Sequence, residues 1–141
     1  MTAQEMWEKA GFSGEYDAWS FGSDSDGLAE LVLKGKKRAT SSAYQLYILE
    51  GEDIPHIGDM SVILDAEDNA VCIIKDVAVY VRSYKKITCE YAAVEGEGDG
   101  SLEYWRNVHE PFFREELSPL GIDFTEDMPV LCEEFELVYP L

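Results

Sequence analysis

The stretch MSVILDAEDNAVCIIKDVAVYV, residues 60–81, carries the pattern that decides the fold class. Apolar and β-branched residues fill 60–64 and 71–81, which is typical of strands. Between them DAEDN, residues 65–69, is rich in the residues that favour turns. This order predicts a β-hairpin. Further along, residues 130–139 alternate Phe135, Leu137 and Tyr139 with Glu134, Glu136 and Val138, which predicts a half-buried strand that closes the sheet.

Helical patterns lie on both sides of the hairpin. Thr2 and Glu5 form a capping-box pair that predicts a short helix over about residues 3–10. A second helix is expected to start after Ser23 or Asp24 and to end at Gly35. Residues 36–42 should then form either an exposed connector or a short strand between this helix and the next.

Three more helices are expected. Ser42 is predicted to cap one that ends near Gly51, and Thr88 to begin another. Ser101 should start the last, which Pro111 is expected to kink or restart.

These elements form one α+β unit of 141 residues in which strands and helices are interleaved, without an internal repeat or a linker. We expect a single domain over residues 1–141, a small barrel with flanking helices. The first helix is expected to be an appendage over about residues 1–18.

The formal charge of −18 argues against binding to duplex DNA or long RNA, which depends on cationic side chains. The cations are nevertheless clustered, at residues 34–38 and 82–86. These clusters are either a local positive site on an acidic body or solvated turn charges.

Other classes of site are disfavoured by composition. The three cysteines are widely spaced, so buried thiols are expected, and with two histidines no metal site or cofactor is predicted. Carboxylates leave magnesium as a weak alternative. The apolar runs are too short for a membrane span and the start is acidic, so we expect a cytoplasmic protein.

The heptapeptide GKKRATS, residues 35–41, is the first candidate for chemistry. Lys36 and Arg38 flank Lys37, and neighbouring positive charge favours the neutral form of a lysine. A neutral Lys37 within reach of Thr40 can take its hydroxyl proton, so that the oxygen attacks a carbonyl carbon. The competing interpretation is electrostatic, because helix C-termini attract cations.

Two further groups of side chains are candidates. Glu95, Glu97 and Asp99 on the loop EGEGDG can supply a proton donor to a leaving amine, or they are simply a solvated acidic loop. Flat rings can stack a nucleobase, although most are expected in the core: Trp19, Phe21, Tyr44, Tyr47, Trp105, Phe112 and Phe113. His109 is interpreted as a structural histidine.

Five segments in this order resemble the ASCH family: WSFG at 19–22, GKKRATSS at 35–42, PxxGD at 55–59, YAAVEGEGDGSLEYWRNVH at 91–109 and CEEFELVY at 132–139. The likeness covers nearly the whole chain and points to the longer bacterial branch. It implies a PUA-like pseudo-barrel with a cleft, linked to RNA or modified nucleosides.

A shorter relative in that family hydrolyses the acetyl amide of N4-acetylcytidine. By this resemblance, Lys37 is the proton acceptor, Thr40 the nucleophile and Glu95 the proton donor. The broad family pattern has glutamate and arginine where this chain has Thr40 and Ser42. The substrate-binding residues implied are Trp19, Phe21, Lys36, Arg38, Ser41, Ser42, Tyr44 and Trp105.

Three functions therefore stay open. The leading one is an amidohydrolase of an acylated nucleoside or similar small amide. The second is a module that binds short single-stranded RNA, with a ribonuclease as its variant. The third is a protein-interaction domain. The oligomeric state is left open.

Overall fold

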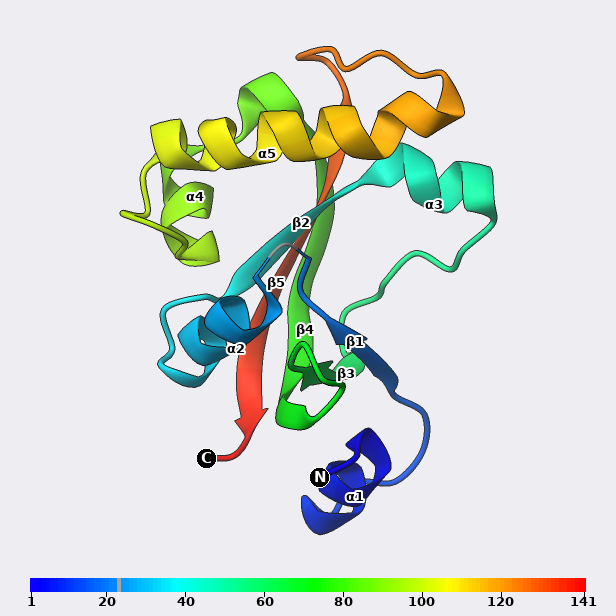
Figure 1. The fold of residues 1–141 in the computed structure, drawn as a ribbon, viewed down its shortest axis with the longest axis vertical. Helices are drawn as coiled ribbons and strands as arrows, with labels where there is room; N and C mark the ends of the chain where they lie inside the picture. The colour runs from blue at the N-terminus through cyan, green and yellow to red at the C-terminus, as the bar shows by residue number, and fades with distance from the viewer. Residues whose placement is uncertain (23) are drawn as a thin grey trace.

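The structure is a computed structural model that describes residues 1–22 and 24–141 (Figure 1). Helices and strands alternate along most of the chain, as expected. Their bounds are α1 Ala3–Lys9, β1 Asp17–Ser20, α2 Ser25–Leu33, β2 Ala39–Ala43, α3 Tyr44–Glu50, β3 Met60–Leu64, β4 Ala70–Ser83, α4 Cys89–Glu95, α5 Leu102–Leu117 and β5 Pro129–Tyr139.

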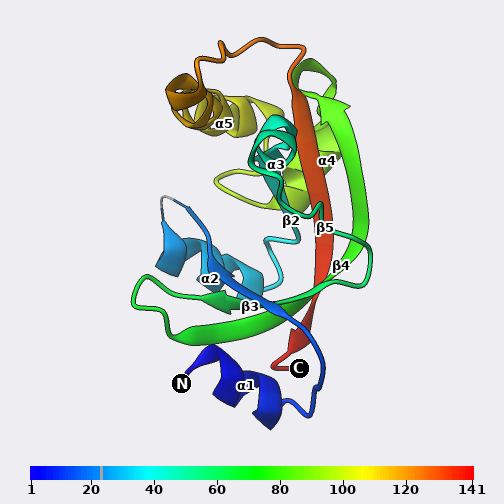
Figure 2. The ribbon, with the colours of Figure 1, turned by 90° about the vertical axis from the view of Figure 1, so that its right-hand side faces the viewer.

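The described strands form one five-stranded sheet in the order β1-β3-β4-β5-β2. The β3–β4, β4–β5 and β5–β2 pairs are antiparallel, and β1 is parallel to β3. The sheet curves into a half-barrel with helices against it, so the predicted α+β barrel with flanking helices is confirmed (Figure 2).

The hairpin that decides the fold class is present, since β3 pairs with β4 across the turn at 65–69. The closing strand is also confirmed, because β5 pairs with both β4 and β2. Most helix starts follow the predicted signals: Thr2, Thr88 and Ser101 each accept a backbone hydrogen bond at the start of their helix. Asp24 caps α2, while Ser23 lies outside the described residues.

Two local expectations were wrong. Ser42 does not cap α3 but belongs to β2, which runs straight into that helix. Cys72 and Cys132 are buried as expected, but Cys89 is exposed. The helix α5 has Pro111 inside it, so it does not restart there. The strand β1 begins at Asp17, near the expected end of the appendage.

Buried apolar side chains form three clusters on the sheet. The helices α4 and α5 cover the β2–β5 end, α2 covers the middle, and α1 packs at the opposite end against β3 and β4. Figure 1 shows α5 across one end of the long strands and α1 near both termini at the other. Among the residues described, no helix is long and apolar enough to cross a membrane.

The C-terminus of α4 is docked on the connector between α2 and β2. The backbone N–H of Arg38 donates to the carbonyl oxygen of Val94 at 2.8 Å. Gly96 follows with φ +72°, and a Cβ at this residue would lie 1.7 Å from the carbonyl oxygen of Lys36. Only glycine allows both this left-handed conformation and this approach. The docking brings the end of α4 beside Lys37.

The variant Gly96→Ala should therefore destabilise the fold by more than about 3 kcal/mol, because backbone strain and a backbone clash combine. Gly51→Ala is the matched control, since Gly51 also has a positive φ, +66°, but nothing lies near its Cβ position. It should cost only about 1 kcal/mol. Urea unfolding measures both, and equal losses would contradict the docking argument.

Candidate active site

Lys37 lies in the connector before β2 and is only 1% exposed. Its Nζ donates to the carbonyl oxygen of Ala39 at 2.8 Å and to a carboxylate oxygen of Glu97 at 3.0 Å. It also lies 5.1 Å from the ring centroid of Phe21. Carboxylate oxygens of Glu95 and Glu97 lie 3.7 Å and 3.0 Å from Nζ, which is the environment that suits an ammonium group.

Glu95, in the last turn of α4, is 2% exposed and surrounded by donors. Its carboxylate accepts hydrogen bonds from the Ser41 hydroxyl at 2.8 Å and from the Trp105 indole N–H. The Lys37 Nζ lies 3.7 Å away. The Ser41 hydroxyl is also 2.9 Å from the Tyr91 hydroxyl. A buried carboxylate with this many donors is held firmly in one position.

His109, in α5, completes this buried group. Its Nδ1 lies 2.8 Å from the Trp105 carbonyl oxygen, which can only accept, so Nδ1 carries a proton. Its Nε2 lies 3.0 Å from Glu95. Burial alone would lower the pKa of His109, but the hydrogen bond and charge of Glu95 raise it. The contact is therefore that of an imidazolium with a carboxylate.

The same pairing keeps Glu95 ionised. Burial alone would raise the pKa of Glu95, but the hydrogen bond and charge of His109 and the charge of Lys37 lower it to about 2. Two cations, Lys37 and His109, thus face two carboxylates, Glu95 and Glu97. The burial of these charges is tolerated because they are paired. We call these four residues the buried charge cluster.

Glu95, Glu97 and His109 also place three metal-type ligand atoms within 4.8 Å of one another. The Lys37 ammonium, however, contacts both carboxylates, and both His109 nitrogens already face oxygen atoms. A metal ion would have to displace these contacts. The geometry assigns the carboxylates to holding Lys37 and His109.

A groove of about 1410 Å³ lies on the other side of β2. Alternation along the strand sends Thr40 and Ser42 to the groove and Ser41 to the buried charge cluster. Rings and acids make up much of the lining: Tyr16, Trp19, Phe21, Tyr47, Phe112, Glu15, Asp17, Glu52, Asp53, Asp59, Asp76, Glu116 and Glu133.

The structure brings some of the predicted residues together and separates others. Lys37 and Glu95 meet, but the Thr40 side chain lies on the groove face rather than beside Glu95, where Ser41 is found. Trp19, Phe21 and Ser42 also line the groove. The remaining candidates do not: Trp105 is in the core, Lys36 and Arg38 are exposed, and Tyr44 is half-buried.

The surroundings of the predicted catalytic residues differ from those expected. Lys36 and Arg38 were expected to favour a neutral Lys37, but their side chains are exposed, and Lys37 Nζ contacts the carboxylates of Glu95 and Glu97. Glu95 was expected to donate a proton, and the contacts with His109 and Lys37 lower its pKa to about 2. The catalytic roles of Lys37, Thr40 and Glu95 stay predictions.

Sequence reasoning missed Asp76 and Glu133, which are 6% and 9% exposed and line the groove. Glu133 lies directly opposite Thr40 across the β2–β5 pair. A signal was available, because strand alternation puts Glu133 on the same face as Phe135, and Asp76 on the same face as Ile74. A charged residue at an apolar position of a strand is unusual.

The two carboxyl groups lie close enough to act on each other's pKa. Burial is the main reason that the pKa of Glu133 rises to about 8, and the charge of Asp76 adds to it. Burial likewise raises the pKa of Asp76 to about 6, with Asp59 and Asp17 contributing. Near neutral pH the pair therefore shares a proton.

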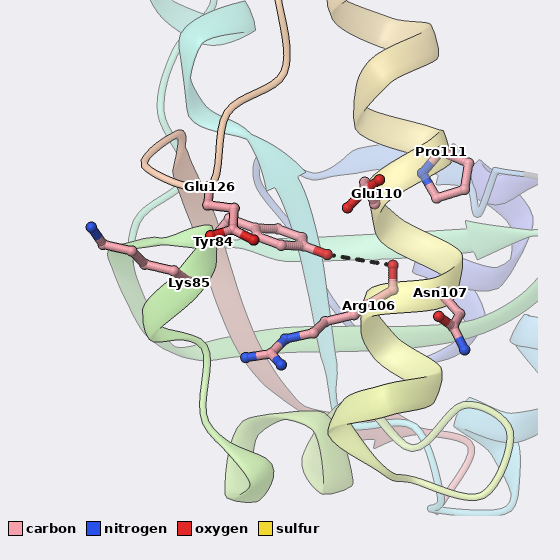
Figure 3. A pocket seen from close by; sticks show the side chains of 7 residues that line it. All are labelled: Tyr84, Lys85, Arg106, Asn107, Glu110, Pro111 and Glu126. Atoms are coloured by element: carbon pink, nitrogen blue, oxygen red, sulfur yellow. Dashed lines mark hydrogen bonds between the residues drawn. The ribbon is translucent and has the colours of Figure 1, made fainter.

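A second hollow, of about 460 Å³, lies between η1 (Tyr84–Lys86) and α5 (Figure 3). Its side chains carry mixed charges, and the Tyr84 hydroxyl donates only a long hydrogen bond, 3.5 Å, to the Arg106 carbonyl oxygen. It contains none of the predicted site residues. We therefore place the candidate site at the groove and the buried charge cluster.

The comparisons with known proteins agree with this fold. The family model of the ASCH domain matches residues 17–139, which is most of the chain. The chain belongs to the ASCH family. Among curated proteins, none matches its sequence.

Solved ASCH structures resemble it closely. The ASCH domain from Lactobacillus crispatus JV V101 is 34% identical with a TM-score of 0.89, covering 96% of this chain and 93% of that one. Protein EF3133 from Enterococcus faecalis V583 is 33% identical with a TM-score of 0.83, covering 96% and 86%. Hypothetical protein PH0355, at 19% identity and a TM-score of 0.57, covers 87% and 99% and shares the fold. The PUA-like fold expected for an ASCH domain is thus confirmed.

In this ASCH domain, Glu95→Gln should lower the pKa of His109 and reduce stability by about 3 kcal/mol or more, because two buried cations lose a counter-charge. Proton NMR titration of His109, with His56 as internal reference, measures the first effect. Glu110→Gln is the control, since it breaks only the exposed pair with Arg114 and should cost less than about 0.5 kcal/mol. An unchanged His109 titration would contradict the ion pair.

The pair of Asp76 and Glu133 predicts that the stability of the fold depends on pH. Because Glu133 binds its proton more tightly in the folded state, its contribution to stability falls as pH rises from about 4.5 to about 8. Glu133→Gln should remove this fall and raise the free energy of unfolding near pH 8 by about 2 kcal/mol. Urea unfolding across this range measures it; a loss of stability in the variant near pH 8 would contradict the assignment.

Proposed function

We propose that this ASCH protein is an amidohydrolase that acts on an acylated nucleoside such as N4-acetylcytidine, or on a similar small amide, with Thr40 as nucleophile and Lys37 as base. One observation carries the proposal. The Lys37 ammonium binds the carbonyl of Ala39, the residue before Thr40, and lies over Phe21, which lines the groove that Thr40 faces. The Lys37 amine therefore contacts the residue before Thr40 and a ring of the groove wall, while Lys37 itself does not line the groove.

The resting ammonium must lose a proton before it acts as a base. Glu97, 3.0 Å from Lys37 Nζ and with a side chain 15% exposed, is the nearest carboxylate that can accept it. The neutral amine then takes the Thr40 hydroxyl proton while the oxygen bonds to the amide carbon. The proton passes to the leaving amine as the C–N bond breaks, and water hydrolyses the acyl-threonine.

Glu95 has a different role in this scheme from the one that the resemblance implies. As a carboxylate bound by Ser41, Trp105 and His109, it fixes the position of Lys37 rather than giving up a proton. The proton that reaches the leaving amine comes through Lys37, with Glu97 as the exchangeable partner. Glu95 is thus a positioning residue.

The groove suits a small substrate that carries no phosphate group. Trp19 and Tyr47 offer faces on which a base can stack, and Ser42 offers a hydroxyl beside Thr40. Among the described residues that line it, eight are acidic and none is lysine or arginine. An RNA strand in this groove would bring its phosphates against those carboxylates, which opposes both the RNA-binding and the ribonuclease alternatives.

Incubation with N4-acetylcytidine should release cytidine and acetate. Thr40→Ala should reduce the rate by at least about 1,000-fold, because the attacking oxygen is gone. Thr40→Ser keeps that oxygen and should retain activity within about tenfold. Ser42→Ala, which changes the next hydroxyl on the same face of β2, should also cost less than about tenfold. Product formation is followed by chromatography.

No release by the wild type would reject the acylcytidine substrate, and full activity in Thr40→Ala would reject the nucleophile. A labelled single-stranded RNA is titrated alongside at low and moderate salt. Tight, salt-dependent binding or shortening of the strand would favour the alternative functions instead.

A further inference from the structure

The floor of the groove holds two carboxyl groups that no basic group balances. Asp76 of β4 and Glu133 of β5 are each more than nine-tenths buried, at 6% and 9% exposure. Both line the groove, and within residues 1–22 and 24–141 neither carboxyl group forms an ion pair or accepts a hydrogen bond from an N–H donor. Buried carboxylates are usually paired with cations, so this pair lacks its complement.

The residues around the pair strengthen its negative potential. Asp59 and Asp17 are close enough to raise the pKa of both carboxyl groups after the larger effect of burial. A concave surface lined by one sign of charge concentrates ions of the other sign. Any ligand that reaches this floor is therefore selected for positive charge.

The walls favour an organic cation over a bare metal ion. In the described part of the chain, the one group of three or more ligand atoms within 4.8 Å is that of Glu95, Glu97 and His109, so the groove carboxylates do not form a compact cage. Aromatic rings line the groove as well, and the charges of Glu133 and Asp76 act on the Tyr47 hydroxyl. Rings and carboxylates together suit an ammonium group on an apolar body.

We propose that the groove binds a small organic cation through a protonated amine that donates hydrogen bonds to Asp76 and Glu133. The amine replaces the missing counter-charge, and the aromatic walls contact the rest of the ligand. This inference deepens the proposed function, because the subsite would select amides that also carry an amine. It concerns binding alone, so it can hold even if hydrolysis fails.

The shared proton makes the binding dependent on pH. An entering ammonium favours the doubly ionised pair, so a proton leaves Glu133 when the ligand binds near neutral pH. Affinity should rise with pH up to about 8. The other titratable groups that line the groove come from several elements. They are Glu15, Tyr16 and Asp17 just before and at the start of β1, Tyr47 of α3, Glu52 and Asp53 after α3, His56 and Asp59 before β3, and Glu116 of α5.

Isothermal titration calorimetry of the full chain with benzylammonium tests the proposal, and benzyl alcohol is the neutral probe of the same shape. Benzylammonium should bind at least about tenfold more tightly than the alcohol. Asp76→Asn and Glu133→Gln should each weaken it about tenfold or more. Asp53→Asn removes the same charge from an exposed position of the lining and should change affinity less than about twofold.

The binding enthalpy is measured near pH 7 in buffers that differ in ionisation enthalpy. Its dependence on the buffer should show that the protein releases up to about one proton per ligand bound. Equal affinity for the alcohol, or unchanged binding by Glu133→Gln with its fold verified by circular dichroism, overturns the proposal. Saturation by Mg²⁺ without binding of benzylammonium also overturns it and assigns the pair to a metal. Calorimetry follows binding alone, so its result is independent of whether the wild type hydrolyses N4-acetylcytidine.

Discussion

The contact between Lys37 and the two carboxylates at the end of α4 and just after it is the constraint on which the candidate site depends. It joins the connector before β2 to a loop about sixty residues later in the chain. A buried ammonium is tolerated only beside its counter-charges, and Glu95 in turn needs His109. The positions of α4, α5 and β2 are therefore fixed relative to one another by charge as well as by apolar packing.

The structure has two polar regions with different electrostatic designs, one on each side of β2. On one side the charges are balanced and every buried group has a partner, which makes the buried charge cluster rigid. On the other side the carboxyl groups of Asp76 and Glu133 repel each other and share a proton. A binding site is expected to combine a rigid framework with polar groups that have no partner in the protein. Here the buried charge cluster is the rigid part, and the carboxyl groups of Asp76 and Glu133 are available to a ligand.

The sequence predicts the fold better than it predicts the site. The hairpin, the closing strand and the capped helices follow from local patterns, since periodicity and capping act over a few residues. The family resemblance singled out Lys37 and Glu95, which do meet. Local patterns could not tell that Thr40 and Ser41 face different regions, because that depends on which face of β2 the helices cover. Glu133 was missed because its environment comes from β4 and β2.

The pairing of β2 with β5 has a consequence for biosynthesis. Residues 39–43 pair in the sheet with residues 130–134. During translation β2 therefore emerges long before the strand that it pairs with. Closing so long a segment makes such pairing slow. We conclude that Thr40 acquires its setting late in folding, when nearly all of this sequence has left the ribosome.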